Sequence, residues 1–337
     1  MINRTGKYTT LFTDGPSILG AGAVAGPKEA QGPLGKGFDK IIYDAKAGAD
    51  TWEQAESAFQ REALITALSK TKLKAEDLDY IFSGDLLNQC ISSSNALKEF
   101  SIPYLGQYGA CSTMAQSLIM AAFVLQSGTA KNCACVTSSH FCSAERQYRF
   151  PLEYGGQRTP SAQWTVTGSG CAILGEGKKN SVRITGATVG RILDLGVKDA
   201  NNMGAAMAPA AAQTILDFFK DTGKNLDDFD RIFTGDLGLV GSKLLYELTL
   251  KEGYDLRHKH DDCGMLIFDR DRQDVHAGGS GCGCAASVLC SHILNQMTTG
   301  KLRHILFIAT GALMSPTSCQ QGLSIPCVAH LVELTFL

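Results

Sequence analysis

Apolar residues recur at helical spacing in two stretches of the chain. The first stretch holds Phe59, Ala63, Leu64, Ala67 and Leu68, and the second holds Ala211, Ile215, Leu216 and Phe219. Apolar positions three and four residues apart predict a helix with one buried face. After an Asp-rich turn, each stretch leads into a short apolar strand that ends at Gly-Asp. The pattern therefore predicts the same helix and strand twice.

These two units are copies of one sequence. Residues 64–86 align without a gap on residues 215–237, at a constant offset of 151 residues. Within this segment, residues 79–86 and 230–237 agree at six of eight positions. Agreement in both spacing and chemistry indicates an internal duplication.

The same order of elements continues after each copy. Glycine-rich segments at 109–117 and 281–287 open helices, which lead into strands at 133–137 and 304–309 and then into strands at 166–174 and 325–332. This order predicts an α/β fold in which helices face mixed sheets, and two halves that pair about a pseudo-twofold axis. We expect the halves to be 1–178 and 179–337, with an aromatic and basic loop insertion at 141–163 in the first half only.

Composition and charge narrow the class of protein. The 337 residues are 44% hydrophobic and 19% charged, and the formal net charge of -2 argues against nucleic acid as the main partner. No segment has the apolar length expected of a signal peptide or a spanning helix, which predicts a soluble protein. Twelve cysteines without a Cys-x-x-Cys pair predict buried thiols in a reducing compartment.

Cys111 is the first candidate for chemistry. The motif Tyr108-Gly-Ala-Cys-Ser-Thr113 places its thiol where a glycine-flanked turn enters an apolar helix. A helix N-terminus stabilises a thiolate, and its free N–H groups can hold an oxyanion. A small buried cysteine without a function fits the same spacing, so both interpretations stay open.

A duplicated α/β unit with a cysteine at the central helix of its first half resembles the thiolase and ketoacyl-synthase superfamily. The resemblance implies a thiolase-like fold of five layers, αβαβα, and a cysteine that carries an acyl group. Enzymes of this kind have two polar residues opposite the cysteine. The first is a histidine, and the second is a histidine or an asparagine. This sequence has Gly235 or Asp236 at the first place and Cys282 at the second. Without an imidazole or amide donor, condensation lacks its expected groups.

The chain also resembles the stage V sporulation protein AD family along nearly its whole length. The motifs that carry the resemblance are Ala25-Gly-Pro-Lys-Glu29, Gly84-Asp-Leu-Leu-Asn-Gln89, Tyr108-Gly-Ala-Cys-Ser-Thr113, Thr137-Ser-Ser-His140, Ala144-Glu-Arg-Gln147, Glu153-Tyr-Gly-Gly-Gln157, Lys259-His-Asp-Asp-Cys-Gly264 and Ala277-Gly-Gly-Ser-Gly-Cys282. The resemblance implies a non-catalytic protein that binds dipicolinic acid and supports its uptake into the developing spore. It also implies a role in spore germination. It also implies other stage V sporulation A membrane proteins as partners, a homodimer, and a place in the forespore at the inner spore membrane.

Dipicolinate is a planar dicarboxylate, so its pocket should offer cationic or N–H donors beside a flat wall. The candidate ligand-binding residues are Cys111, His140, Arg146, Asp236, His276, Cys282 and His330. For each histidine and for the arginine, a structural or surface role is the alternative. Asp85 and Asp236 end equivalent strands and are expected to anchor loops. The alternative is that they hold calcium when dipicolinate is bound as its calcium chelate.

Two motifs suggest other ligands. Residues 20–25 match the Gly-x-Gly-x-x-Ala dinucleotide fingerprint, but Pro27 should prevent the helix that must follow at once, so we predict a strand and a loop without a cofactor. His258, His260 and Cys263 could ligate zinc, although their irregular spacing fits a polar turn better.

Two other functions stay open. The chain could be an acyltransferase or condensing-type enzyme in which Cys111 carries the acyl group and His140, His276 or His330 serves as a relocated base. It could instead be a scaffold for membrane subunits with a vestigial pocket. A stable acyl adduct on Cys111 would favour the enzyme.

Overall fold

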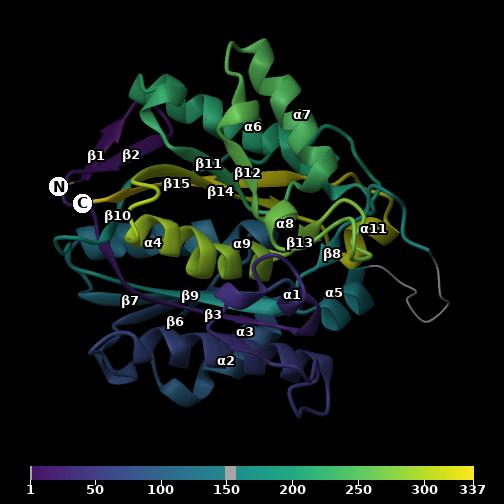
Figure 1. Cartoon of the computed structure of the whole chain (residues 1–337), viewed down its shortest axis with the longest axis horizontal. Helices are drawn as coiled ribbons and strands as arrows, with labels where there is room; N and C mark the ends of the chain where they lie inside the picture. Colours follow the sequence, from purple (N-terminus) through teal and green to yellow (C-terminus); the bar gives the residue numbers. More distant parts are fainter. Residues whose placement is uncertain (1, 149–156) are drawn as a thin grey trace.

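The computed structural model describes residues 2–148 and 157–337. Helices and sheets alternate in five layers (Figure 1). One outer layer holds α2 (Trp52–Ser69) and α3 (Ile91–Leu97), the central layer holds α4 (Thr113–Gln126) and α9 (Cys282–Val288), and the other outer layer holds α6 (Met203–Thr222) and α7 (Gly238–Lys251). The predicted thiolase-like αβαβα architecture is therefore confirmed.

Each half contributes one mixed sheet. The first contains β3 (Ser17–Ala25), β9 (Gly168–Gly175), β7 (Asn132–Ser139), β5 (Tyr80–Gly84) and β6 (Tyr104–Gly106), and the second contains β10 (Val182–Thr188), β15 (Cys327–Phe336), β14 (His304–Ala312), β11 (Arg231–Thr234) and β12 (His260–Asp262), in those orders. β5 pairs with β7, and β11 with β14, in parallel, whereas β7 with β9 and β14 with β15 are antiparallel. The order of elements is thus repeated, as the duplication predicts.

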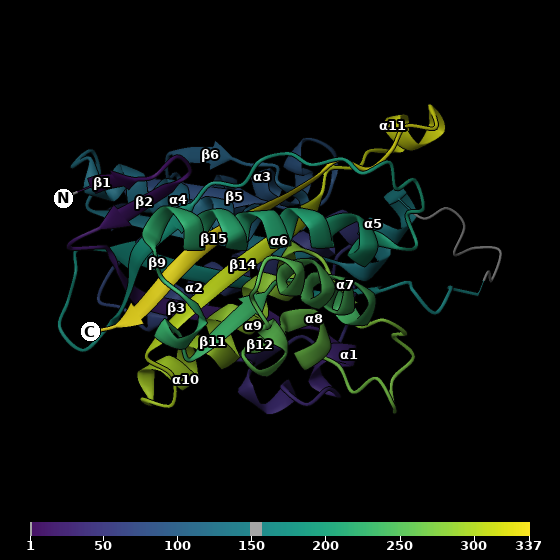
Figure 2. The same ribbon diagram turned by 90° about the horizontal axis from the view of Figure 1, so that it is seen from above.

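Short elements connect these layers. They are β1 (Ile2–Thr5), β2 (Thr9–Phe12), α1 (Pro27–Ala30), β4 (Lys40–Ile41), α5 (Phe141–Tyr148), β8 (Trp164–Thr165), α8 (Cys263–Leu266), β13 (Gly279–Ser280), α10 (Leu294–Thr298) and α11 (Pro316–Gln320). β2 pairs with β10, so the start of the chain adds a strand to the second half. Figure 2 shows α6 lying across β14 and β15.

Two local expectations were wrong. A helix of one turn, α1, begins directly at Pro27, because proline lacks only an N–H that the first helical position leaves unpaired anyway. The segment expected as a loop insertion begins with helix α5, and its residues 149–156 lie outside the described part of the chain. The strand expected before Pro27 is present as β3.

The central helices are buried on most sides, which explains their sequences. Met114, Leu118 and Ala122 of α4 have no exposed surface, and α9 consists of small and apolar residues that are all buried. Close packing requires glycine at one contact: a Cβ at Gly170 of β9 would lie 2.2 Å from the carbonyl oxygen of Ala286 in α9. The thiols are unpaired, and most of them are buried, as predicted.

Candidate functional site

Cys111 lies at the junction of the two halves. It belongs to a 3-10 turn, Ala110–Ser112, that runs directly into α4, and Ala110 takes a positive φ of 49° to make the turn. β14 of the second half passes so close that a Cβ at Gly311 would lie 2.1 Å from the carbonyl oxygen of Gly109. The thiol is consequently held in a fixed place and is almost fully buried.

Asp236 reaches this thiol from the second half. It follows β11 and is fully buried. One carboxylate oxygen accepts a hydrogen bond from Thr310 Oγ at 2.8 Å, and the other accepts from Gly281 N at 2.9 Å and from Ser280 Oγ at 3.1 Å. The Cys111 thiol lies beside the same carboxylate. A fixed acid thus lies at the place where the resemblance to the superfamily implies an imidazole.

The protonation state of Cys111 follows from these neighbours. Burial raises the pKa of the thiol well above its ordinary value, and the nearby Asp236 carboxylate raises it further. The Gly281 N–H and the Ser280 hydroxyl lower the pKa by less. The expectation that the helix N-terminus would favour a thiolate was therefore wrong, because desolvation and the adjacent acid outweigh the helix end.

Cys282 completes the inner wall of the site. It packs with Leu86, Ala110, Cys111 and Ala144 in one apolar cluster, and its thiol donates to the carbonyl oxygen of Ser138 at 2.8 Å. Burial raises the pKa of this thiol as well. At the place where the resemblance implies a histidine or an asparagine, the chain therefore presents a neutral thiol whose proton already forms a hydrogen bond.

A cavity of about 30 Å³ lies against Cys111, enough room for one or two water molecules. Its lining residues are Leu86, Tyr108, Ala110, Cys111, Ala144, Glu145, Tyr148, Thr165, Met203, Ser280, Ala312 and Met314, which we call the Cys111 pocket. None of these residues is a lysine, an arginine or a histidine.

Two tyrosines close the Cys111 pocket. Their hydroxyl groups lie 3.0 Å apart, and Tyr148 also donates to the carbonyl oxygen of Leu86, while Tyr108 lies within 3.3 Å of the carbonyl oxygen of Met314. Burial raises the pKa of Tyr108 to about 12, so both rings stay neutral at ordinary pH. The cover of the pocket thus consists of a few hydrogen bonds between uncharged groups.

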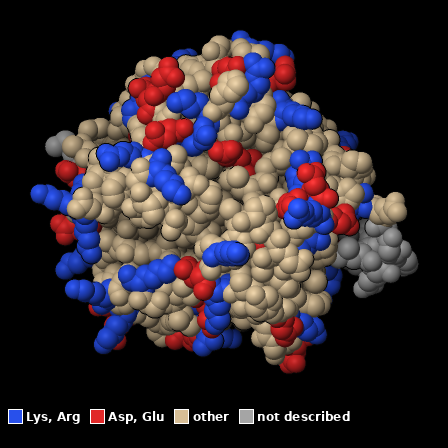
Figure 3. Space-filling view, in the orientation of Figure 1, with Lys and Arg blue, Asp and Glu red and all other residues tan. Residues whose placement is uncertain are grey.

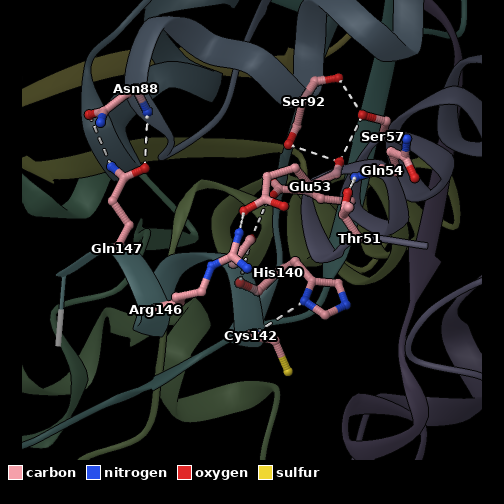
Figure 4. A network of polar contacts seen from close by, with 12 residues as sticks. Thr51, Glu53, Gln54, Ser57, Asn88, Ser92, His140, Cys142, Arg146 and Gln147 are labelled. Carbon is pink, nitrogen blue, oxygen red and sulfur yellow. Dashed lines mark hydrogen bonds and ion pairs between the residues drawn. The ribbon is translucent and has the colours of Figure 1, made fainter. Parts of the chain in front are cut away.

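His140 lies outside the lining of the Cys111 pocket. Its Nε2 donates to the carbonyl oxygen of Ala45 at 2.8 Å, and its Nδ1 accepts from Cys142 N at 3.1 Å (Figure 4). The ring packs against Trp52 and Phe59, and burial lowers its pKa. Both nitrogens are therefore occupied by contacts within the chain, and the ring is neutral.

The remaining predicted residues are also placed elsewhere. Arg146 is exposed and forms an ion pair with Glu53 (Figure 4). His276 Nε2 lies 3.0 Å from a carboxylate oxygen of Asp274. His330 accepts from a backbone N–H of residue 190, and burial lowers its pKa to about 4. The structure therefore brings Cys111, Asp236 and Cys282 together and leaves His140, Arg146, His276 and His330 out of the pocket.

Several pocket residues were missed by the sequence analysis, Glu145 above all. Glu145 is buried and accepts from Thr165 Oγ at 3.2 Å. Ala144, Glu145 and Tyr148 share one face of α5, because residues three and four apart lie together on a helix. A helical reading of residues 141–148 could have found this face, which Arg146 does not share.

His258, His260 and Cys263 are not brought together as a metal site in the described part of the chain. The residues the structure describes contain no group of three or more His, Cys, Asp or Glu side chains placed to hold a metal ion. His260 is instead held between the hydroxyl groups of Thr234, at 2.7 Å, and Tyr246, at 3.0 Å. The polar turn is thus the better interpretation of that motif.

Comparison with solved structures agrees with the order of the layers. The chain is similar to 3-oxoacyl-[acyl-carrier-protein] synthase III from Aquifex aeolicus, with 14% identity, a TM-score of 0.59, and 96% of this chain and 100% of that chain covered. It is also similar to OleA from Xanthomonas campestris with cerulenin bound, with 14% identity, a TM-score of 0.62, and 96% and 99% covered. The fold is that of the thiolase-like condensing enzymes.

A closer relationship is found within this class. Residues 6–335 match the family described as stage V sporulation protein AD. The stage V sporulation protein AD of Bacillus subtilis is 45% identical over 326 residues, which are 97% of this chain and 96% of that protein. The chain belongs to the stage V sporulation protein AD family, and it is a sporulation protein. In the described ranges, every helix is too short or too polar to serve as a transmembrane span.

Proposed function

We propose that this sporulation protein binds dipicolinate in the Cys111 pocket without chemical turnover, and that it supports dipicolinate uptake into the developing spore together with spore membrane proteins. The observation that carries the proposal is the replacement of the imidazole opposite Cys111 by the buried, fully hydrogen-bonded Asp236. A pocket that lies at the substrate site of the fold but lacks a catalytic base is suited to binding a ligand rather than to condensation.

Charge favours the calcium chelate as the ligand. Among the residues that the structure describes, the pocket lining includes no cationic side chain, and Glu145 is one of its members. A free dipicolinate dianion would find no cation among these described lining residues to offset its two charges. The chelate with one calcium ion is neutral, and calcium accepts six to eight oxygen ligands, so Glu145 can bind the metal beside the dipicolinate.

Entry of the ligand requires the tyrosine cover to move. A cavity of about 30 Å³ holds one or two waters, whereas a pyridine dicarboxylate is several times larger. Rotation of Tyr108 and Tyr148 breaks the contacts between their hydroxyl groups and with Leu86 and Met314. Each neutral hydrogen bond contributes about 1 kcal/mol to the stability of the closed cover. The free energy of ligand binding can therefore offset the loss of these bonds.

Calorimetric titration with dipicolinate, with and without calcium, tests the proposal. We expect saturable binding in calcium, weakened about tenfold or more when calcium is removed. Glu145→Gln should abolish the calcium effect, whereas Arg146→Gln, the next residue of α5 but exposed and outside the pocket, should leave it unchanged. No saturable heat from the native protein in either condition would overturn the proposal.

The enzyme alternative is separated by a second measurement. Incubation with acyl-CoA and mass spectrometry of the intact protein should detect no adduct on Cys111, because the thiol is buried and protonated. An acyl group on Cys111 would assign the chain to the acyltransferases instead.

Homodimerisation is part of the proposal. β6 is an edge strand paired only with β5, and its Tyr104 and Leu105 are exposed. An exposed apolar edge favours pairing with a second copy. Sedimentation should show a dimer that Leu105→Glu converts to a monomer, and a wild-type monomer at all concentrations would contradict this.

A further inference from the structure

A second concave region lies at the opposite end of α4 from Cys111. The turn that carries Cys111 precedes the first residue of α4, and Gln126, its last residue, lines this region. Fourteen residues of helix separate the two places by roughly 20 Å. The region is a groove of about 1180 Å³, far larger than the Cys111 pocket. It is therefore a separate feature of the molecule.

The groove is basic. Its lining includes Lys70, Lys72, Lys131, Lys178 and Arg183 but only two carboxylates, Asp14 and Glu176; we call it the basic groove. The whole chain has a net charge of -2, so this excess of cations is local. Figure 3 shows lysines and arginines along the left edge of the molecule, the side on which Figure 1 places both termini.

The cations of the basic groove are only partly neutralised. Lys70 forms an ion pair with Asp39 at 2.6 Å, and Arg183 donates to the carbonyl oxygen of Lys178. Lys72 and Lys131 are exposed and have no ion pair with any residue that the structure describes. The lining also includes five apolar residues, which we call its apolar floor: Pro16, Leu19, Leu73, Leu125 and Ala130. Like charges held together without partners attract an anion.

We propose that the basic groove binds an acidic peptide segment of a partner protein. A groove, rather than a flat or convex basic surface, suits an extended chain more than a lipid surface. Its apolar floor accepts aliphatic side chains, while the flanking lysines pair with Asp or Glu residues of the segment. A small anion such as phosphate would use only part of this volume.

The proposal can be tested with a fluorescent twelve-residue peptide of alternating glutamate and leucine. The test variant carries Lys72→Glu, Lys131→Glu and Lys178→Glu. The matched control carries Lys220→Glu, Lys243→Glu and Lys251→Glu on α6 and α7, which changes the net charge equally on the opposite outer layer. Fluorescence anisotropy should show a loss of affinity of about 100-fold for the test variant and less than about threefold for the control.

The competing ligands are outcomes of the same experiment. Equal losses in both variants would overturn the proposal, because they would show attraction by net charge alone. Sedimentation with anionic phosphatidylglycerol vesicles that depends on the groove lysines, without peptide binding, would overturn it in favour of a lipid surface. Displacement of the peptide by millimolar inorganic phosphate would show a small-anion site and would also contradict it. Dipicolinate titration of the test variant should match the native protein, which separates this result from the function of the Cys111 pocket.

Discussion

Asp85 and Asp236 occupy equivalent places in the two halves but have different contacts. Each follows the glycine at the end of its strand, β5 or β11. Asp85 accepts from Leu87 N at 2.9 Å and from the backbone and hydroxyl of Ser93 at 2.8 and 2.6 Å, all within its own half. Asp236 holds its own glycine-rich loop and in addition reaches Cys111 of the other half.

This difference shows how two copies of one fold form a single pocket at Cys111. Asp85 anchors the segment that follows its own strand, because it accepts from Leu87 N. Asp236 instead holds Ser280, Gly281 and Thr310, and the segment after β11 is held by Asp262. Asp236 has the Cys111 thiol of the opposite half beside it and raises the pKa of that thiol, whereas Asp85 has the acidic side chain of Glu56 as a neighbour. The two halves thus share one backbone fold, but the side chains around their equivalent acids differ.

The largest expected effect is on stability. Asp236→Ala leaves buried donors of Ser280, Gly281 and Thr310 without an acceptor and should cost about 4 kcal/mol of unfolding free energy. Above about pH 8, where Glu56 is ionised, Asp85→Ala should cost about 2 kcal/mol, because it also removes the repulsion between Asp85 and Glu56. Urea unfolding measures both values, and an equal loss would contradict the assigned difference.

The neighbour of Asp85 predicts a pH dependence. Burial, followed by the charge of Asp85, raises the pKa of Glu56 from 4.5 to about 8. The folded state therefore keeps a proton that the unfolded chain releases, so stability should fall as pH rises from about 4.5 to about 8. Glu56→Gln should flatten this slope by at most about 1.4 kcal/mol per pH unit. Thermal unfolding across this range checks it, and a slope unchanged by the substitution would count against it.

A third comparison concerns the reactivity of Cys111. Asp236→Asn removes a charge that raises the pKa of the thiol, so alkylation of Cys111 by iodoacetamide should become about tenfold faster, equivalent to one pKa unit. Asp85→Asn is the control and should change the rate less than about twofold. Peptide mapping by mass spectrometry reads the rate at Cys111 alone, and equal rates in the two variants would refute the assignment.

The smallest effect is expected at Arg146. Its ion pair with Glu53 is exposed and should contribute less than about 1 kcal/mol. Arg146→Ala should therefore leave both stability and calcium dipicolinate binding nearly unchanged. If calorimetry showed a large loss of binding in this variant, Arg146 would be part of the ligand site.

The fold could be predicted from the sequence because it repeats. The match between residues 79–86 and 230–237 fixed the equivalent strands, and the helical spacing before them fixed the outer helices. The resemblance to condensing enzymes, and not the repeat itself, led us to expect Asp236 and Cys282 opposite Cys111.

The rest of the pocket depends on a segment that the repeat does not cover. Residues 141–148 form a helix, and its rotation decides that Glu145 lies in the pocket while Arg146 lies in solvent. His140 resembles a ligand in sequence, but its partner is a carbonyl oxygen 95 residues earlier in the chain. Contacts of this kind arise from packing and have no local signal.

The most direct test is a crystal structure of the native chain grown with calcium dipicolinate. We expect the ligand beside Cys111 with its calcium ion on Glu145, the hydroxyl groups of Tyr108 and Tyr148 separated, and Asp236 still bonded to Gly281. A closed tyrosine cover with the ligand bound elsewhere, or with no ligand bound, would contradict the assignment of this pocket.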